Sequence, residues 1–198
     1  MHMLVSAVSG WGKGWLMQVL IEMNIRSDTY DRVVVLDTSD EFRGLVSEET
    51  GPRLASHWFA GERERDHFSP AVWEDMIDRN EALVIGRHVA KDDWQEVACD
   101  VILACRRSDH DVLIGIDEAH GIAPEREGYP KEIQDLATDG RTEGGSATSS
   151  IWVTQRLAQL CKKVVGNGTA RYLGGYQSGN DLNAVKDVLE YPKRAHNT

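Results

Sequence analysis

The sequence predicts an α/β fold of three layers, with a mainly parallel central sheet between two layers of helices. Short apolar runs typical of buried parallel strands are expected near residues 3–8, 32–37, 81–86, 112–117, 149–154 and 171–176. Helix-like patterns alternate with them, at 14–25, 70–79, 93–107, 131–139, 155–165 and 180–190. With 198 residues, of which 41% are hydrophobic, the chain can bury a full core as a single domain over residues 1–198.

The first strand and the first helix are joined by a glycine-rich segment, residues 7–14, that is typical of a phosphate-binding loop. Backbone N–H groups in such a turn form a concave nest, the helix N-terminus adds partial positive charge, and Lys13 can reach the outer phosphates of a nucleotide. An ordinary strand-to-helix turn is the alternative interpretation. The predicted nucleotide-binding residues are Ser9, Gly10, Trp11, Gly12, Lys13, Gly14 and Trp15.

The loop departs from the G-x-x-x-x-G-K-[ST] pattern at two positions. Ala7 replaces the first glycine, and Gly14 stands where a Ser or Thr hydroxyl would bind Mg²⁺. We expect water, Thr38 or Ser9 to supply the missing ligand, and hydrolysis to be slow rather than absent, because Mg²⁺ normally keeps several waters.

Two tryptophans flank the lysine of the loop. Trp11 and Trp15 are expected to pack on the domain's own surface, with contact to a nucleotide or to a neighbouring subunit as the alternatives.

After the second predicted strand the pattern becomes polar. Glycine and proline break any periodicity in residues 46–69, which are therefore predicted to form an excursion from the core. Ser69 and Pro70 then begin a helix, because serine is a good N-cap and proline suits the first helical turn.

A pair of carboxylates follows the apolar strand at 112–117. A buried parallel strand presents its carboxyl end to the ligand crevice of an open α/β sheet, so Asp117 is predicted to hold Mg²⁺ and Glu118 to polarise the water that attacks a γ-phosphate. An acid-rich helix N-terminus is the alternative. His120, close by, is expected to be an ordinary packed or solvated histidine.

The apolar strand at 149–154 is also followed by polar side chains at its carboxyl end, Thr154 and Gln155. A glutamine at that strand end can hydrogen-bond both a γ-phosphate and the attacking water, so Gln155 is predicted to sense which nucleotide is bound.

At this point the chain resembles the FtsK/HerA superfamily of P-loop ATPases. The resemblance spans nearly the whole chain and rests on five segments in the family's order. They are Ser9 to Lys13, Val33 to Asp37 with Glu41 to Leu45, Ile116 to His120, Asp139 to Arg141, and Trp152 to Arg156. The compact size is most similar to the small genome-packaging ATPases of membrane-containing viruses.

This resemblance implies an additional-strand (RecA/ASCE-like) P-loop NTPase fold. It also implies a motor that hydrolyses ATP with Mg²⁺ and translocates double-stranded DNA. In that family the motor is a homo-oligomeric ring, a hexamer. The resemblance further implies that Arg141 reaches the nucleotide of the neighbouring subunit, with Arg156 and Arg171 as competitors. A capsid or viral membrane protein is a further implied partner. The alternatives are an assembly or secretion ATPase that moves protein, a nucleotide-binding subunit with little hydrolysis, and a generic α/β domain.

Composition limits these readings. A net charge of −10, from 32 Asp and Glu against 22 Lys and Arg, opposes a nucleic-acid-coating protein, but a ring needs few basic groups in its channel. The basic pairs at 106–107 and 162–163 are candidates for that channel, and the acidic excess favours a salt-loving host. A haloarchaeal virus is a further expectation from the resemblance.

The remaining features concern location and cysteine chemistry. No apolar run is long enough for a transmembrane segment, so an intracellular place, in the host cytoplasm or virion-associated, is expected. Cys99, Cys105 and Cys161 have no metal-ligand spacing and are expected to be buried thiols, and residues 191–198 are expected to form a loose tail.

Overall fold

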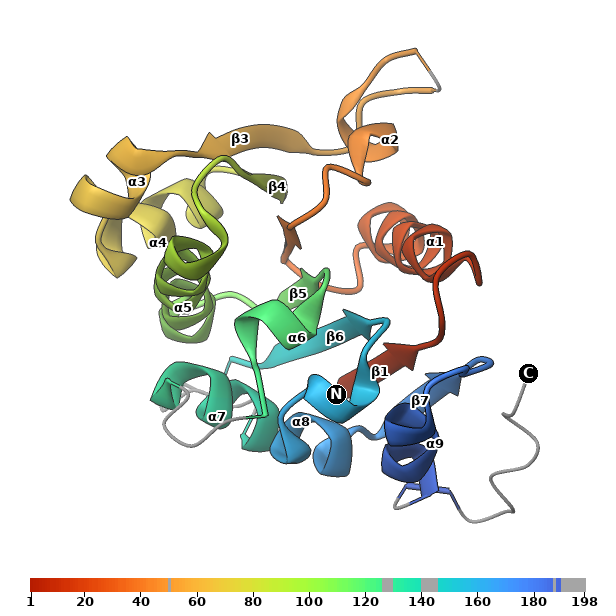
Figure 1. The fold of residues 1–198 in the computed structure, drawn as a ribbon. Helices are drawn as coiled ribbons and strands as arrows, with labels where there is room; N and C mark the ends of the chain where they lie inside the picture. The colour runs from red at the N-terminus through yellow and green to blue at the C-terminus, as the bar shows by residue number, and fades with distance from the viewer. Residues whose placement is uncertain (50, 126–129, 140–145, 187, 190–198) are drawn as a thin grey trace.

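The computed structural model describes residues 1–49, 51–125, 130–139, 146–186 and 188–189 of the chain. Within these ranges the strands form one seven-stranded sheet in the order β3-β4-β2-β5-β6-β1-β7, and every pairing is parallel (Figure 1). The strands are β1 (His2–Ser6), β2 (Arg32–Asp37), β3 (Ser56–Ala60), β4 (Ala82–Arg87), β5 (Val112–Ile116), β6 (Thr148–Thr154) and β7 (Ala170–Leu173).

Helices connect the strands and cover both faces of the sheet. They are α1 (Lys13–Ser27), α2 (Arg43–Val46), α3 (Glu62–His67), α4 (Pro70–Asp78), α5 (Lys91–Arg107), α6 (Ala119–Ile122), α7 (Lys131–Thr138), the 3-10 turn η1 (Leu157–Gln159), α8 (Lys162–Asn167) and α9 (Gly179–Lys186). The predicted three-layer fold with a parallel sheet is confirmed. Among the described helices, none combines the length and the apolarity needed to cross a bilayer.

Alternation along the central strands divides the core in two. Met3 and Val5 of β1 face α1 and α2, whereas Leu4 between them faces the cluster built by α4, α5, α7 and α8. The same alternation runs along β2, and Figure 1 shows α1 on one side of the sheet and α4, α5 and α7 on the other. Successive side chains of a strand point to opposite faces, so a strand buried on both sides reads as a continuous apolar run.

The sheet order places the candidate site residues along one edge. The strand that precedes the glycine-rich loop, β1, is separated from the acidic strand β5 by β6, which ends at Thr154 and Gln155. Because all three strands are parallel, their carboxyl ends lie at the same edge of the sheet. This order confirms the predicted additional-strand arrangement.

The segment that the sequence analysis left without regular structure contains β3, at the edge of the sheet, and α3. Trp58 and Phe59 of β3 are 37% and 49% exposed, and the strand pairs with β4 along one side. Ser56 and His57 interrupt the apolar run of this strand, so the sequence did not reveal it, whereas the other edge strand, β7, was predicted.

The helix expected at 155–165 is replaced by η1 and α8, and that prediction was wrong. Leu160 forms a bridge with Pro124, and the N–H of Cys161 donates to Ala123 O at 2.9 Å. These contacts with the segment after α6 hold the chain extended between the two helical turns. The three cysteines are buried, as predicted, and burial raises the pKa of the Cys99 thiol to about 12.

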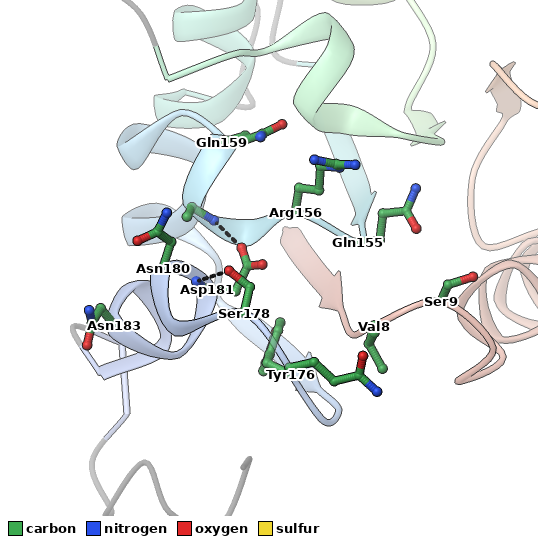
Figure 2. A pocket seen from close by; sticks show the side chains of 12 residues that line it. Val8, Ser9, Gln155, Arg156, Gln159, Tyr176, Ser178, Asn180, Asp181 and Asn183 are labelled. Atoms are coloured by element: carbon green, nitrogen blue, oxygen red, sulfur yellow. Dashed lines mark hydrogen bonds between the residues drawn. The ribbon is translucent and has the colours of Figure 1, made fainter. Parts of the chain in front are cut away.

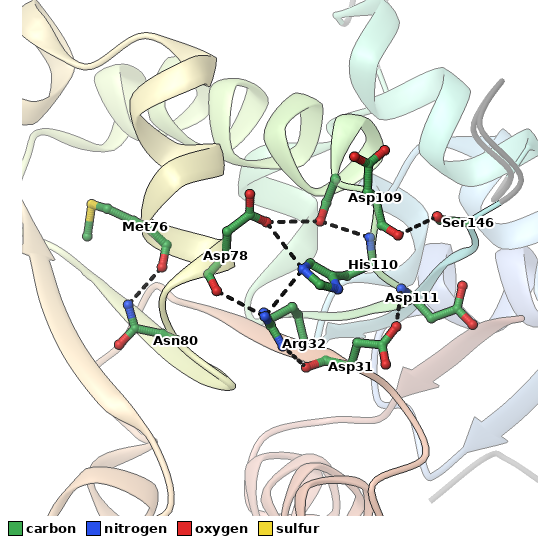
Figure 3. A network of polar contacts seen from close by, with 10 residues as sticks. Asp31, Arg32, Met76, Asp78, Asn80, Asp109, His110, Asp111 and Ser146 are labelled. Carbon is green, nitrogen blue, oxygen red and sulfur yellow. Dashed lines mark hydrogen bonds and ion pairs between the residues drawn. The ribbon is translucent and has the colours of Figure 1, made fainter.

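A polar network fixes the opposite, amino-terminal edge of the sheet (Figure 3). An Arg32 Nη donates to Asp78 O at 3.0 Å, which ties the start of β2 to the end of α4. Asp31 accepts the N–H of Asp111 at 2.9 Å, and His110 Nε2 lies 3.9 Å from Asp78 Oδ1. The network therefore holds β2 and β5 in register at the edge remote from the glycine-rich loop.

Candidate active site

The glycine-rich loop follows β1 and turns sharply into α1. Gly10 and Gly12 have φ values of 84° and 75°, and Gly12 is the N-cap of the helix. A side chain with a Cβ is disfavoured in this left-handed region, so the turn depends on glycine at both positions. The turn leads directly into the first turn of α1, whose leading N–H groups have no carbonyl partner within the helix.

Lys13 is folded back over its own loop. Its Nζ donates to Val8 O at 3.2 Å. Burial lowers the pKa of the Lys13 ammonium, and the carboxylates of Glu118, Glu41 and Asp117 act against that shift by raising it. The lysine therefore lies among the acidic side chains of the site. Its ammonium could bind a phosphate if the hydrogen bond to Val8 O were replaced by one to a phosphate oxygen.

Asp117 is a buried carboxylate with an unsatisfied oxygen. Its residue is 3% exposed, and its Oδ2 has no hydrogen-bond partner. Burial raises the pKa of the Asp117 carboxyl to about 7, with added repulsion from Glu118, Glu41 and Asp37. A buried charge needs a compensating partner, and a divalent cation is one that carboxylate oxygens favour, so these residues fit the Mg²⁺ that the sequence predicts.

Thr38 connects the ends of β2, β5 and α5. Its Oγ1 donates to Asp117 O at 2.9 Å and accepts the indole N–H of Trp94, also at 2.9 Å. The hydroxyl thus already serves the backbone of Asp117, which weakens the expectation that Thr38 supplies the ligand missing at Gly14.

Glu118 is held by contacts with the end of β6. Gln155 Nε2 donates to Glu118 Oε1 at 3.0 Å, while His120 Nδ1 lies 3.2 Å from Oε2 and also hydrogen-bonds Thr154 Oγ1 at 3.1 Å. Glu118 itself adopts the left-handed conformation, at φ 46° and ψ 45°. Such a conformation is uncommon for a residue with a side chain and often marks a functional position.

The predicted carboxylate and glutamine therefore meet in space. His120 was expected to be an ordinary packed or solvated histidine. It is packed, and its ring lies against the Glu118 carboxylate.

Solved structures with the same fold were found, although no protein-family model and no curated protein sequence matches the chain. The genome-packaging NTPase B204 of Sulfolobus turreted icosahedral virus 2, in complex with AMP, aligns with a TM-score of 0.65 and 16% identity, over 93% of this chain and 80% of that chain. The chain has a P-loop NTPase fold, similar to that of a viral genome-packaging enzyme.

Two further B204 structures give the same result. The ATP-gammaS complex from the same virus aligns with a TM-score of 0.62 and 14% identity, over 93% of this chain and 79% of that chain. B204 described as the DNA-packaging ATPase of Sulfolobus Turreted Icosahedral Virus aligns with a TM-score of 0.63 and 15% identity, over 94% of this chain and 80% of that chain. These likenesses identify a P-loop NTPase fold.

Two open cavities flank the ends of β1 and β6. The larger, about 740 Å³, lies between the loop and α9 (Figure 2). Five of its twelve lining residues carry side-chain amides, and Ser9 and Gln155 border it. The other lining residues are Val8, Arg156, Ala158, Gln159, Tyr176, Gln177, Ser178, Asn180, Asp181 and Asn183.

The second cavity, about 480 Å³, lies over Glu118 and Gln155 and contains basic side chains that the sequence analysis missed. Arg87 and Lys91 line it together with Arg156. Arg87 Nε donates to Thr38 O at 3.2 Å. Only the fold brings these two residues, Arg87 at the end of β4 and Lys91 at the start of α5, to the site.

The remaining predicted residues are the candidate trans arginines and the two tryptophans of the loop. Arg141 lies outside the described residues. Arg171, on the edge strand β7, donates to Gly166 O at 3.1 Å. Trp15 is 71% exposed, so the prediction that it packs on the domain's own surface was wrong. Trp11 is 55% exposed, and its ring lies against Gly174 after β7, so it packs on that surface in part.

The two basic pairs considered for a DNA channel are largely engaged within the chain. Arg106 pairs with Asp135 at 3.3 Å, and Lys162 pairs with Glu125 at 3.2 Å. Lys163 Nζ donates to Gln134 Oε1.

Proposed function

We propose that the chain is an ATPase that drives packaging of double-stranded DNA into a virus particle, as a homo-oligomeric ring and by resemblance a hexamer. The observation that carries the proposal is the hydrogen bond of 3.0 Å between Gln155 and Glu118, in a site that also contains the glycine-rich loop and the unpaired Oδ2 of Asp117. A fold similar to that of the B204 packaging NTPase supports it.

Each residue has a distinct role in this proposal. The loop amides and Lys13 hold the β- and γ-phosphates, and Asp117 contributes to holding Mg²⁺. The bound ion would neutralise charge on the phosphate oxygens. Glu118 orients the attacking water and accepts its proton, and Gln155 moves between Glu118 and the γ-phosphate.

Arg141 is proposed to act in trans, across the interface with the neighbouring subunit. In mixed rings, Arg141→Ala subunits should lower the turnover of wild-type neighbours. Unchanged neighbours would transfer the role to Arg156 or Arg171.

The proposed setting is the cytoplasm of the infected host or the virion, with a capsid or viral membrane protein as the docking partner. The acidic composition supports a salt-rich host. A protein that stays folded and monodisperse in low salt, and is indifferent to molar salt, would contradict that part.

The test is Mg²⁺-dependent ATP hydrolysis by wild type and by Glu118→Gln, with and without double-stranded DNA. Glu81→Gln, at the exposed amino end of β4, is the matched control. Hydrolysis that DNA stimulates and that only Glu118→Gln abolishes supports the motor. An ATPase rate that DNA does not change favours the alternative of an assembly or secretion ATPase that moves protein. Nucleotide binding without hydrolysis favours a nucleotide-binding regulatory subunit.

A further inference from the structure

The space beside Gly14 is filled by a carboxylate from another element. A Cβ built on Gly14 would meet Oε2 of Glu41 well inside van der Waals contact, and the Glu41 Cδ would lie 3.7 Å from it. Glu41 follows β2 and is distant in sequence from the loop. Its carboxylate therefore lies where the side chain of a serine or threonine at position 14 would lie.

The backbone that carries Glu41 is fixed by a buried side chain. Both carboxylate oxygens of Asp37 accept backbone N–H groups, from Glu41 at 3.0 Å and from Phe42 at 3.1 Å. Asp37 and Phe42 are buried, whereas Glu41 is exposed. The turn after β2 is thus rigid at its base and presents an accessible carboxylate to the loop.

The Glu41 carboxylate points into the same region as two other charged groups. Its charge raises the pKa of Lys13 and of Asp117. Oδ2 of Asp117 is buried and lacks a partner. In the described part of the chain, no cluster of three or more His, Cys, Asp or Glu side chains forms a complete metal site. Mg²⁺ is commonly held instead by one or two carboxylates together with substrate phosphates.

We propose that Glu41 supplies the metal ligand that Gly14 lacks, so that its carboxylate replaces the loop hydroxyl and holds Mg²⁺ on the nucleotide together with Asp117. The inference rests on the proposed nucleotide site. Asp37 is then a positioning residue for Glu41. An anionic ligand differs from a hydroxyl in one measurable respect, because it repels a nucleotide that arrives without its metal ion and attracts the ion itself.

Calorimetric binding of ATP-γ-S, in Mg²⁺ and in EDTA, tests the inference without measuring turnover. The proteins are wild type, Glu41→Ala, Gly14→Ser and the double variant, with Glu48→Ala as a control from the same exposed segment. Glu41→Ala should weaken binding in Mg²⁺ by roughly tenfold or more, the range seen when metal-supporting groups are removed. Its binding in EDTA should be unchanged or tighter.

The double variant gives the decisive comparison. Gly14→Ser alone should not tighten binding, because the new side chain meets Glu41, whereas Gly14→Ser combined with Glu41→Ala should recover most of the Mg²⁺-dependent affinity. Equal losses in Mg²⁺ and EDTA for Glu41→Ala, or no recovery in the double variant, would overturn the inference and leave the proposed function standing. A wild-type protein that binds no nucleotide would refute both.

Discussion

Replacing Asp117 with asparagine should stabilise the metal-free protein and weaken its binding of nucleotide with Mg²⁺. The carboxylate is 3% exposed, its Oδ2 is unpaired, and burial raises its pKa from 3.8 to about 7. Asparagine keeps the shape and removes the charge. A gain in stability together with a loss of nucleotide binding would show that Asp117 serves the binding site. A residue that serves the fold would lose stability when it is replaced.

The size of the stabilisation follows from the pKa. A rise from 3.8 to about 7 is about 3 units, and at about 1.4 kcal/mol per unit it costs the folded state about 4 kcal/mol once the group is ionised. Because the folded pKa is the higher one, the cost is absent below pH about 4, grows between about 4 and 7, and is complete above 7. The gain from Asp117→Asn should therefore be about 4 kcal/mol at pH 8, as an upper limit, and less than half of that at pH 5.

Urea unfolding in EDTA at the two pH values measures this difference. Asp92→Asn, which removes an exposed carboxylate from the first turn of α5, is the control and should change stability by a few tenths of a kcal/mol at most. Loss of stability in Asp117→Asn at pH 8, or an equal gain at both pH values, would refute the assignment of a buried, uncompensated charge.

Three further outcomes are expected. Gly12→Ala should cost about 1–2 kcal/mol, because φ is 75° there, and should weaken nucleotide binding; a melting temperature equal to that of wild type would contradict this. Asp37→Ala should cost about 2 kcal/mol in urea unfolding by leaving two N–H groups without their acceptor, and Asp37→Asn should cost less. Gln155→Leu breaks the bond to Glu118 and should lower kcat with little change in KM; a raised KM at normal kcat would argue for a binding role instead.

The fold could be predicted from the sequence wherever a buried strand produces a continuous apolar run. The five central strands are buried on both faces and largely apolar along their length, so the sequence revealed them. The two edge strands are partly exposed, and of these β7 was predicted but β3, which exposes Trp58 and Phe59, was missed. The break between η1 and α8 depends on pairing with Pro124, a tertiary contact that local pattern does not contain.

The site was predictable to the extent that it follows strand ends. Asp117, Glu118 and Gln155 end adjacent strands and were expected to meet. Arg87 and Lys91 enter from β4 and α5, and the approach of Glu41 to Gly14 depends on how the turn after β2 packs. Side-chain direction across elements is not encoded in spacing, so these contacts could be found only in the folded chain.

The exposure of the loop tryptophans gives the protein an optical reporter of its own. Of the six tryptophans, Trp73, Trp94 and Trp152 are each 1% exposed and Trp58, on β3, is 37% exposed. Trp11 and Trp15, on either side of Lys13, are the most exposed, at 55% and 71%. A collisional quencher such as acrylamide would therefore reach the loop indoles long before the core ones. Occupation of the loop could be followed from the unlabelled protein, as a loss of the quenchable fraction of its fluorescence.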